Sequence, residues 1–171
     1  ADHGSRRCGG GGPEAGGGHG ASGFADTGTA GNASITMQGA AAGGNAPGSG
    51  GFSGSATAGN ATIVLEGGEG AGAFLDFSDT TSGGQAAFTV TGNALLDMSF
   101  HSPPGMAVGS LAGAGNVKIG SLAITIGTNN QTTEFAGTLQ EPTSHPGSLV
   151  KSGTGSLGLS GRNSYGGGRT P

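Results

Sequence analysis

A repeated motif constrains this chain more than any other feature. A phenylalanine is followed, after five residues, by Ala-Gly-Asn-Ala, a hydroxyl residue and isoleucine, first over residues 24–35 and again over residues 52–63. A looser copy spans residues 77–88, and a degraded fourth copy spans residues 108–119. The length of the motif stays fixed while the filler between copies varies. This is typical of a coil that repeats along an axis and accepts loop insertions.

Each of the first copies runs into a short alternation of apolar and polar residues. Ile35 and Met37 share one face of such a stretch, as do Ile63 and Leu65. A period of two predicts half-buried β-strands. The same alternation recurs at Phe88 and Val90, at Leu122, Ile124 and Ile126, at Phe135 and Leu139, and at Leu157 and Leu159.

The composition excludes a conventional helical or α/β domain. Glycine accounts for 42 of the 171 residues, and each glycine inside a helix costs about 1 kcal/mol relative to alanine. Leu, Ile, Val and Phe together make up about 16% of the chain, below the roughly 20% expected of an ordinary core. A thin stack of short strands with tight turns remains, or a glycine-rich disordered spacer. Disorder usually accompanies a high net charge, whereas the net charge here is only −4.

We therefore expect an all-β fold, a right-handed parallel β-helix or solenoid, in which several coils must stack to bury one apolar face. The internal ladder is expected to comprise Ile35, Ile63, Phe88, Ile124, Leu157 and Leu159. A ladder of amides at a turn is expected from Asn32, Asn60 and Gln85. An antiparallel sandwich also has short strands, but the constant register of the copies favours the solenoid.

The chain divides into three regions. Residues 1–23 are rich in glycine and poor in apolar side chains, which predicts a flexible, disordered tail. Residues 24–107 hold the repeat coils, and residues 108–171 form a third region whose pattern differs.

The third region resembles a known family. From Gly147 to Gly167 the sequence is similar to the passenger-associated β-strand repeat of bacterial autotransporters, which runs roughly L-x-K-x-G-x-G-T-L-x-L-x-G-x-N-T-Y-x-G-G-T-T. The positions that match are Leu149, Lys151, Gly153, Gly155, Leu157, Leu159, Gly161, Asn163, Tyr165 and Gly167. Gly158 replaces a usual threonine, and Arg169 and Pro171 depart from the start of the next strand. Residues 109–137 resemble the usual lead-in to this repeat.

The resemblance implies a secreted passenger at the bacterial cell surface, a β-helical stalk or adhesin, and an outer-membrane β-barrel elsewhere in the parent chain. It implies no catalytic residues, and no host or cell-surface ligand is identified. We expect a structural or interaction protein that is not an enzyme, with no catalytic, cofactor-binding or metal-binding residues.

Other partners and sites are disfavoured by the residues themselves. Residues 24–117 contain six acids and no Lys or Arg, so the basic footprint of a nucleic-acid interface is missing. No apolar run is long enough for a transmembrane helix. Cys8 has no partner cysteine, so no intrachain disulfide and no cysteine metal site are expected. The histidines lack metal-ligand spacing, so surface positions are expected for the histidines. They are His3, His19, His101 and His145.

One enzymatic alternative remains open, because some β-helices cleave polysaccharides. Glycoside hydrolysis needs two carboxyl groups roughly 5–10 Å apart. Asp76 and Asp79 are close in sequence, and Asp97 is expected one coil above them. Nothing in the sequence marks a paired site, so acids that keep the turns soluble are the simpler interpretation.

Overall fold

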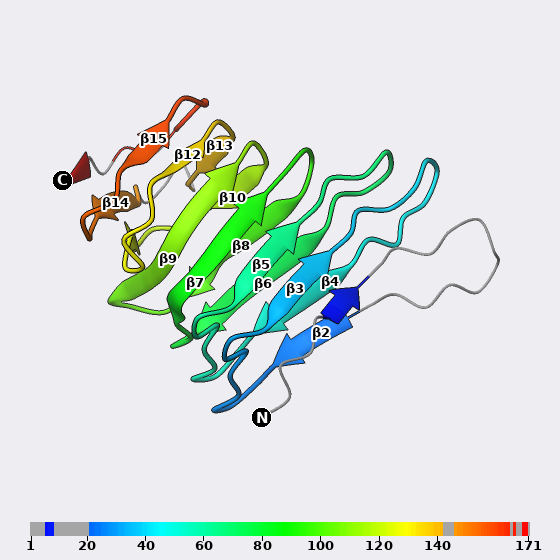
Figure 1. Cartoon of the computed structure of the whole chain (residues 1–171), viewed down its shortest axis with the longest axis horizontal. Coiled ribbons are helices and arrows are strands. Elements are labelled where there is room, and N and C mark those ends of the chain that lie inside the picture. The colour runs from blue at the N-terminus through cyan, green and yellow to red at the C-terminus, as the bar shows by residue number, and fades with distance from the viewer. Residues whose placement is uncertain (1–5, 9–20, 142–145, 165, 167–168, 171) are drawn as a thin grey trace.

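The computed structural model describes residues 6–8, 21–141, 146–164, 166 and 169–170. Within these residues there is no helix, and every strand pairing is parallel. The strands stack as a β-solenoid of about 6 turns, and Figure 1 shows them side by side along the long axis. The predicted all-β parallel solenoid is confirmed, and the antiparallel sandwich is excluded.

Two sheets form the walls of the solenoid. The main path of the larger sheet contains β1 (Arg6–Cys8), β3 (Ser34–Met37), β5 (Thr62–Leu65), β7 (Gly83–Val90), β9 (Gly105–Gly113), β11 (Ala123–Ile126), β14 (Ser148–Lys151) and β16 (Arg169–Thr170), and β12 (Thr133–Phe135) and β15 (Leu157–Leu159) extend it. The smaller sheet contains β2 (Ala21–Phe24), β4 (Ser49–Phe52), β6 (Phe74–Asp79), β8 (Leu95–His101), β10 (Asn116–Lys118) and β13 (Thr138–Gln140). Successive strands from β2 to β9 alternate between the sheets, so each coil contributes to both walls.

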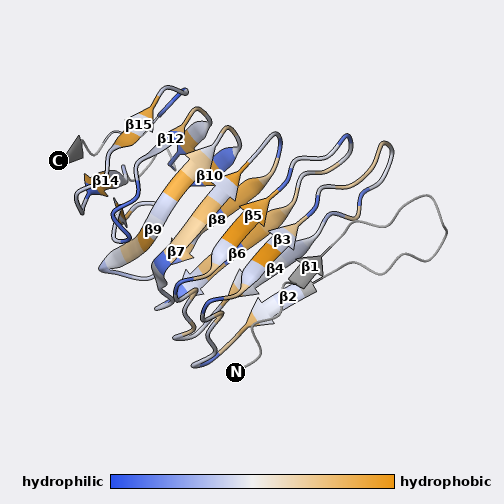
Figure 2. Ribbon diagram, viewed as in Figure 1, coloured by the Kyte–Doolittle hydropathy of each residue, from blue (hydrophilic) through white to orange (hydrophobic). Residues whose placement is uncertain are grey.

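The core lies between the two sheets, because alternate residues of each strand point inward. Figure 2 shows apolar residues concentrated on the strands, including β3, β5 and β7. The largest fully buried side chains are Phe52, Phe77, Phe88, Phe135, Ile35, Met37, Ile63, Leu65, Leu75, Leu96, Met98 and Leu111.

The predicted ladder is confirmed in its first half and wrong as a single row of six. Ile35 is the register partner of Ile63, which is the partner of Phe88, and none of the three is more than 1% exposed. Ile124 is also buried, but it follows a different row, between Met106 of β9 and the strand β14. The last two members, Leu157 and Leu159, lie on β15, pair with β12 and are only partly buried. The rows separate because β9 pairs its second half with β7 and its first half with β11.

The phenylalanine that opens each copy of the motif forms a second ladder. The rings of Phe24 and Phe52 stack with centroids 4.7 Å apart, and those of Phe52 and Phe77 stack at 4.6 Å. Phe88, which belongs to the first ladder on the opposite sheet, meets the ring of Phe77 edge-on at 5.8 Å. The strand spacing of about 4.8 Å imposes this near-parallel stack, which explains why each coil repeats one phenylalanine.

The corner after each phenylalanine explains why the spacing within the motif is the same in each copy. Gly31, Gly59 and Gly84 have φ values of 58°, 62° and 58°, a left-handed conformation that glycine adopts readily. A Cβ atom on Gly59 would lie 2.8 Å from the carbonyl oxygen of Gly31, so the stacked corners also lack room for a side chain. Asn60 Nδ2 donates to Asn32 Oδ1 at 3.1 Å, which confirms the first pair of the predicted amide ladder.

The predicted fourth copy is wrong. Val117 lies on β10 in the smaller sheet and pairs with Leu96, whereas the first three copies end in the larger sheet. The strand that follows β7 in the larger sheet is β9. It continues without a turn at the position where the earlier coils have their glycine corner. The corners on either side meet across it, because Thr128 Oγ1 donates to the carbonyl oxygen of Gly84 at 2.8 Å.

Part of the expected tail lies in strands. Arg6–Cys8 forms β1 and pairs with β3, and Ala21–Phe24 forms β2 and pairs with β4. The rest of that stretch lies outside the described residues. The boundary expected at residue 108 falls within β9. No helix suited to crossing a membrane is found among the residues that the structure describes.

Candidate functional site

The outer face of the smaller sheet carries a line of polar side chains. One residue from each of five neighbouring strands occupies the same register: Gly51, which has no side chain, followed by the polar residues Asp76, Asp97, Lys118 and Gln140. Since neighbouring strands lie about 4.8 Å apart, these five positions form a straight row along the solenoid axis. We call them the polar row.

Asp97 is the most constrained member of the polar row. It is only 3% exposed although it points away from the core. The backbone N–H and the hydroxyl of Ser99 donate to Asp97 Oδ1 at 2.9 and 2.5 Å. Lys118 Nζ lies 3.6 Å from Asp97 Oδ2. Both carboxylate oxygens are therefore engaged, and the Asp97 side chain is fixed in place.

Asp76 is the less constrained partner. Partial burial raises the pKa of the Asp76 carboxyl group above its usual value of 3.8, and the neighbouring Asp97 carboxylate raises it further. Gly51 makes room on the other side, because a Cβ atom there would lie 2.7 Å from Asp76 Oδ1. Glycine at position 51 therefore lets the Asp76 side chain lie over β4.

Of the three carboxylates considered from the sequence, the structure pairs Asp76 with Asp97 across β6 and β8. Asp79 stands apart at the end of β6, with a φ of 57°. Its Oδ2 accepts a hydrogen bond from the backbone N–H of Gly54 at 2.9 Å. Asp79 thus braces the turn of the preceding coil instead of joining the carboxylate pair.

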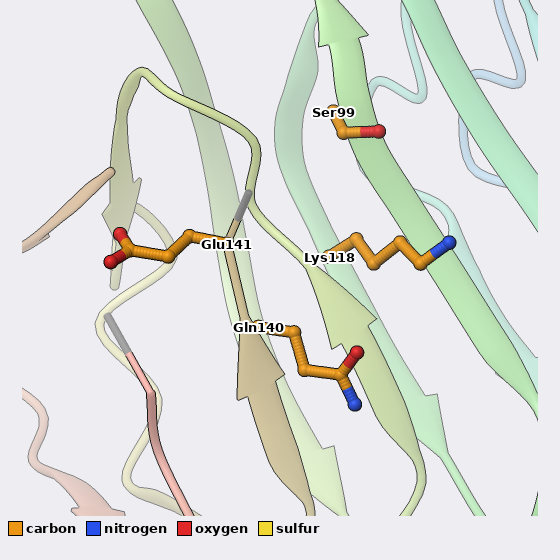
Figure 3. A pocket seen from close by; sticks show the side chains of 4 residues that line it. All are labelled: Ser99, Lys118, Gln140 and Glu141. Carbon is orange, nitrogen blue, oxygen red and sulfur yellow. The ribbon is translucent and has the colours of Figure 1, made fainter. Parts of the chain in front are cut away.

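A hollow of about 250 Å³ adjoins the polar row and is lined by Ser99, Lys118, Gln140 and Glu141. Figure 3 shows that the side chains of Lys118 and Gln140 extend to the same side, whereas Glu141 points away from them. The Glu141 carboxylate accepts hydrogen bonds from the backbone N–H groups of Gly147 and Gly166. Glu141 therefore ties chain segments together, and Ser99, Lys118 and Gln140 are the groups that face the hollow.

A β-bulge in β8 determines which side chains lie on the surface beside this hollow. Asp76 pairs with Asp97, but Ser78 pairs with Phe100, so β8 contains one extra residue. The extra residue inverts the alternation, leaving Phe100 64% exposed and His101 9% exposed. The expected surface position of His101 is therefore wrong. Its two ring nitrogens each lie 2.6 Å from a backbone carbonyl oxygen, on Thr81 and on Ser102.

No feature of the sequence marks this exchange, because a simple alternation continued from Asp97 would place Phe100 inward and His101 outward. Ser99, Lys118 and Gln140 were not singled out either. Their only sequence signal is the coil length, which places Lys118 and Gln140 one and two coils after Asp97.

No group of three or more His, Cys, Asp or Glu side chains that could hold a metal ion occurs in the described part of the chain. His3, His19, His145 and Tyr165 lie outside that part. The arrangement offers hydrogen-bonding groups on a stiff frame, with one exposed aromatic ring beside them. No family model, no curated protein and no solved structure matches this sequence, so the autotransporter resemblance stays a prediction.

Proposed function

We propose that this chain is a structural, non-catalytic segment of a secreted bacterial surface protein of the autotransporter-passenger kind. Its task is to hold loops and one exposed face away from the cell, as a stalk or adhesin. The observation that carries the proposal is the continuous parallel stack, in which the smaller sheet runs without interruption from β2 to β13. A solenoid whose coils contact only their neighbours can be lengthened coil by coil, which suits a stalk.

The positions that match the passenger-associated repeat support this proposal. Leu149 lies on β14 and is 4% exposed. Leu157 and Leu159 lie on β15 and pack against the core. Gly153, between the two strands, has a φ of 70°. The leucines of the pattern thus occupy inward strand positions, and one of its glycines occupies a turn that needs glycine.

The carboxylate pair supports a non-catalytic role. Hydrolysis of a glycosidic bond needs one carboxyl group as acid and a second as base or nucleophile. Here the oxygens of Asp97 are occupied by Ser99 and Lys118. Asp76 is left without a free carboxylate partner.

Surface labelling tests the display role. Antibodies raised against the chain are applied to intact and to permeabilised cells that produce the parent protein, with and without external protease. We expect labelling of intact cells that is lost after protease treatment. Labelling that appears only after permeabilisation would contradict a surface location.

A turnover assay tests the absence of catalysis. The wild-type chain is incubated with plant and microbial polysaccharides, and new reducing ends and unsaturated products are measured beside an Asp76→Asn variant. We expect no product above the buffer blank from either protein. Product that the wild type forms and Asp76→Asn does not would establish an enzyme and overturn this part of the proposal.

A further inference from the structure

The bulge in β8 works against the hydrophobic effect. Without the extra residue, the alternation of β8 would turn Phe100 inward and His101 outward. With it, a phenylalanine remains 64% exposed while a histidine is buried. Bulges re-aim side chains and are frequent beside functional sites, and local departures from folding rules are expected at such sites. Packing of the core therefore does not account for the exposed Phe100 ring, and a binding role would.

Phe100 lies next in sequence to a residue that lines the hollow beside the polar row. It directly follows Ser99, which lines the hollow together with Lys118 and Gln140. Gly120, two residues after the end of β10, lies against Ser99, because a Cβ atom there would lie 2.8 Å from the Ser99 Cα. Gly120 therefore places no side chain over Ser99. Lys118 pairs in register with Asp97, three residues before Phe100. Because of the bulge, Asp97 to Phe100 matches only Asp76 to Ser78 on β6, a separation of about 7 Å along the strand.

The charges on this face limit what can bind there. Asp76 and Asp97 lie in the polar row with the single cation Lys118. Two carboxylates beside one ammonium group disfavour a phosphate- or sulfate-rich polymer, which needs a basic footprint. The groups that remain are a half-exposed ammonium, an amide, a hydroxyl and an aromatic ring. These suit an uncharged ligand that carries many hydroxyl groups and has apolar C–H faces.

We propose that Phe100, Ser99, Lys118 and Gln140 form a binding surface for a neutral polysaccharide. One sugar ring lies against the exposed face of Phe100, since an aromatic ring packs well on C–H groups. Hydroxyl groups of a neighbouring sugar accept from Lys118 and bond to Gln140 across the hollow. Asp97 holds Lys118 in position through the ion pair of 3.6 Å. This inference rests on the proposed display role and names a ligand class for it.

Binding to defined polysaccharides tests the inference. The whole chain is mixed with insoluble cellulose, chitin and xylan, and is run by affinity electrophoresis through gels that contain soluble mannan, starch or xylan. We expect retention by at least one polymer, and at least a tenfold weaker affinity for Phe100→Ala. Thr36→Ala, on β3 in the opposite sheet, serves as the matched control and should bind as the wild type does. Equal retention of wild type and Phe100→Ala, or no retention of the wild type by any polymer, would overturn the inference.

Gln140→Ala provides a second, independent variant, and far-UV circular dichroism melts check that each variant is folded. We expect Gln140→Ala to weaken binding several-fold at an unchanged melting temperature. Failure of this inference is distinguishable from failure of the proposed function. Missing surface labelling would overturn display while leaving retention intact, whereas missing retention would leave labelling intact.

Discussion

Residues 24–90 and residues 95–141 belong to one parallel stack but use it differently. The first stretch repeats one phenylalanine and one glycine corner per coil, and its ladders keep the same register from β3 through β7. The second stretch contains the bulge of β8, the straight passage of β9 and the ion pair between Asp97 and Lys118. Repetition builds the solenoid, and the departures from repetition place side chains where a repeat would not.

The largest effect is expected inside the repeated stretch. Ile63→Asp buries an unpaired carboxylate between Ile35 and Phe88, which should lower the free energy of unfolding by about 4 kcal/mol or more. Thr62→Asp, one residue earlier and exposed on the outer face, is the control and should change stability by less than about 0.5 kcal/mol. Urea unfolding of both variants measures the difference. Similar losses in the two variants would show that Ile63 does not face the core.

A second pair of variants separates backbone strain from crowding at the repeated corner. Gly31 and Gly59 both have positive φ, but a Cβ atom on Gly31 would have no atom within 4 Å, whereas one on Gly59 would meet the Gly31 carbonyl oxygen at 2.8 Å. Gly31→Ala should cost about 1–2 kcal/mol. Gly59→Ala should cost about 2–4 kcal/mol, because overpacking adds to the strain. Thermal melts of the two variants give the comparison, and a larger loss for Gly31→Ala would contradict the stacked corner.

The bulge in the second stretch is tested by neighbouring substitutions. His101→Ala removes the ring that contacts the carbonyl oxygens of Thr81 and Ser102 and should cost about 1–3 kcal/mol. Phe100→Ala, one residue before it, removes a larger but exposed side chain and should cost less than about 0.5 kcal/mol. Chemical denaturation compares them. If Phe100→Ala proves the more destabilising, the bulge does not turn Phe100 outward.

The structure of the first stretch was more predictable from the sequence than that of the second. The ladder of Ile35, Ile63 and Phe88 was predictable because the motif repeats with an unchanged step. The bulge was not, because a single extra residue in β8 changes which side chains point outward and leaves no mark in composition or motif. The fourth copy failed for a related reason: Val117 matches the motif locally, but coil pairing places it in the other sheet. The sequence predicted that Asp97 lies one coil above Asp76. It did not predict the contacts of Asp97 with Ser99 and Lys118, because these depend on the bulge in β8 and on the pairing of β8 with β10.

The smallest effect concerns the pH dependence of stability at the carboxylate pair. Because the folded state raises the pKa of Asp76 above 3.8, folding is favoured with Asp76 protonated, and this contribution is lost as the pH rises through the raised value. Asp76→Asn removes the burial and repulsion of the charge, so its melting temperature should exceed that of the wild type by about 1–2 °C at pH 7. The side chain is partly exposed, and solvent screening keeps the effect small.

The pH series supplies the control for Asp76→Asn. The advantage over the wild type should shrink as the pH falls through the raised pKa of Asp76, because the wild-type carboxyl group then takes up its proton. An Asp76→Asn variant that is less stable than the wild type at pH 7 would contradict the raised pKa and its cause.

We expect the repeats of this chain to stack as a cooperative parallel solenoid instead of forming a glycine-rich spacer. Far-UV circular dichroism of the whole chain during a thermal melt distinguishes the two. We predict a β-type spectrum that is lost in one sigmoidal transition, because each coil is stabilised by contact with its neighbours. A random-coil spectrum that changes only gradually with temperature would show that the coils do not stack in this way.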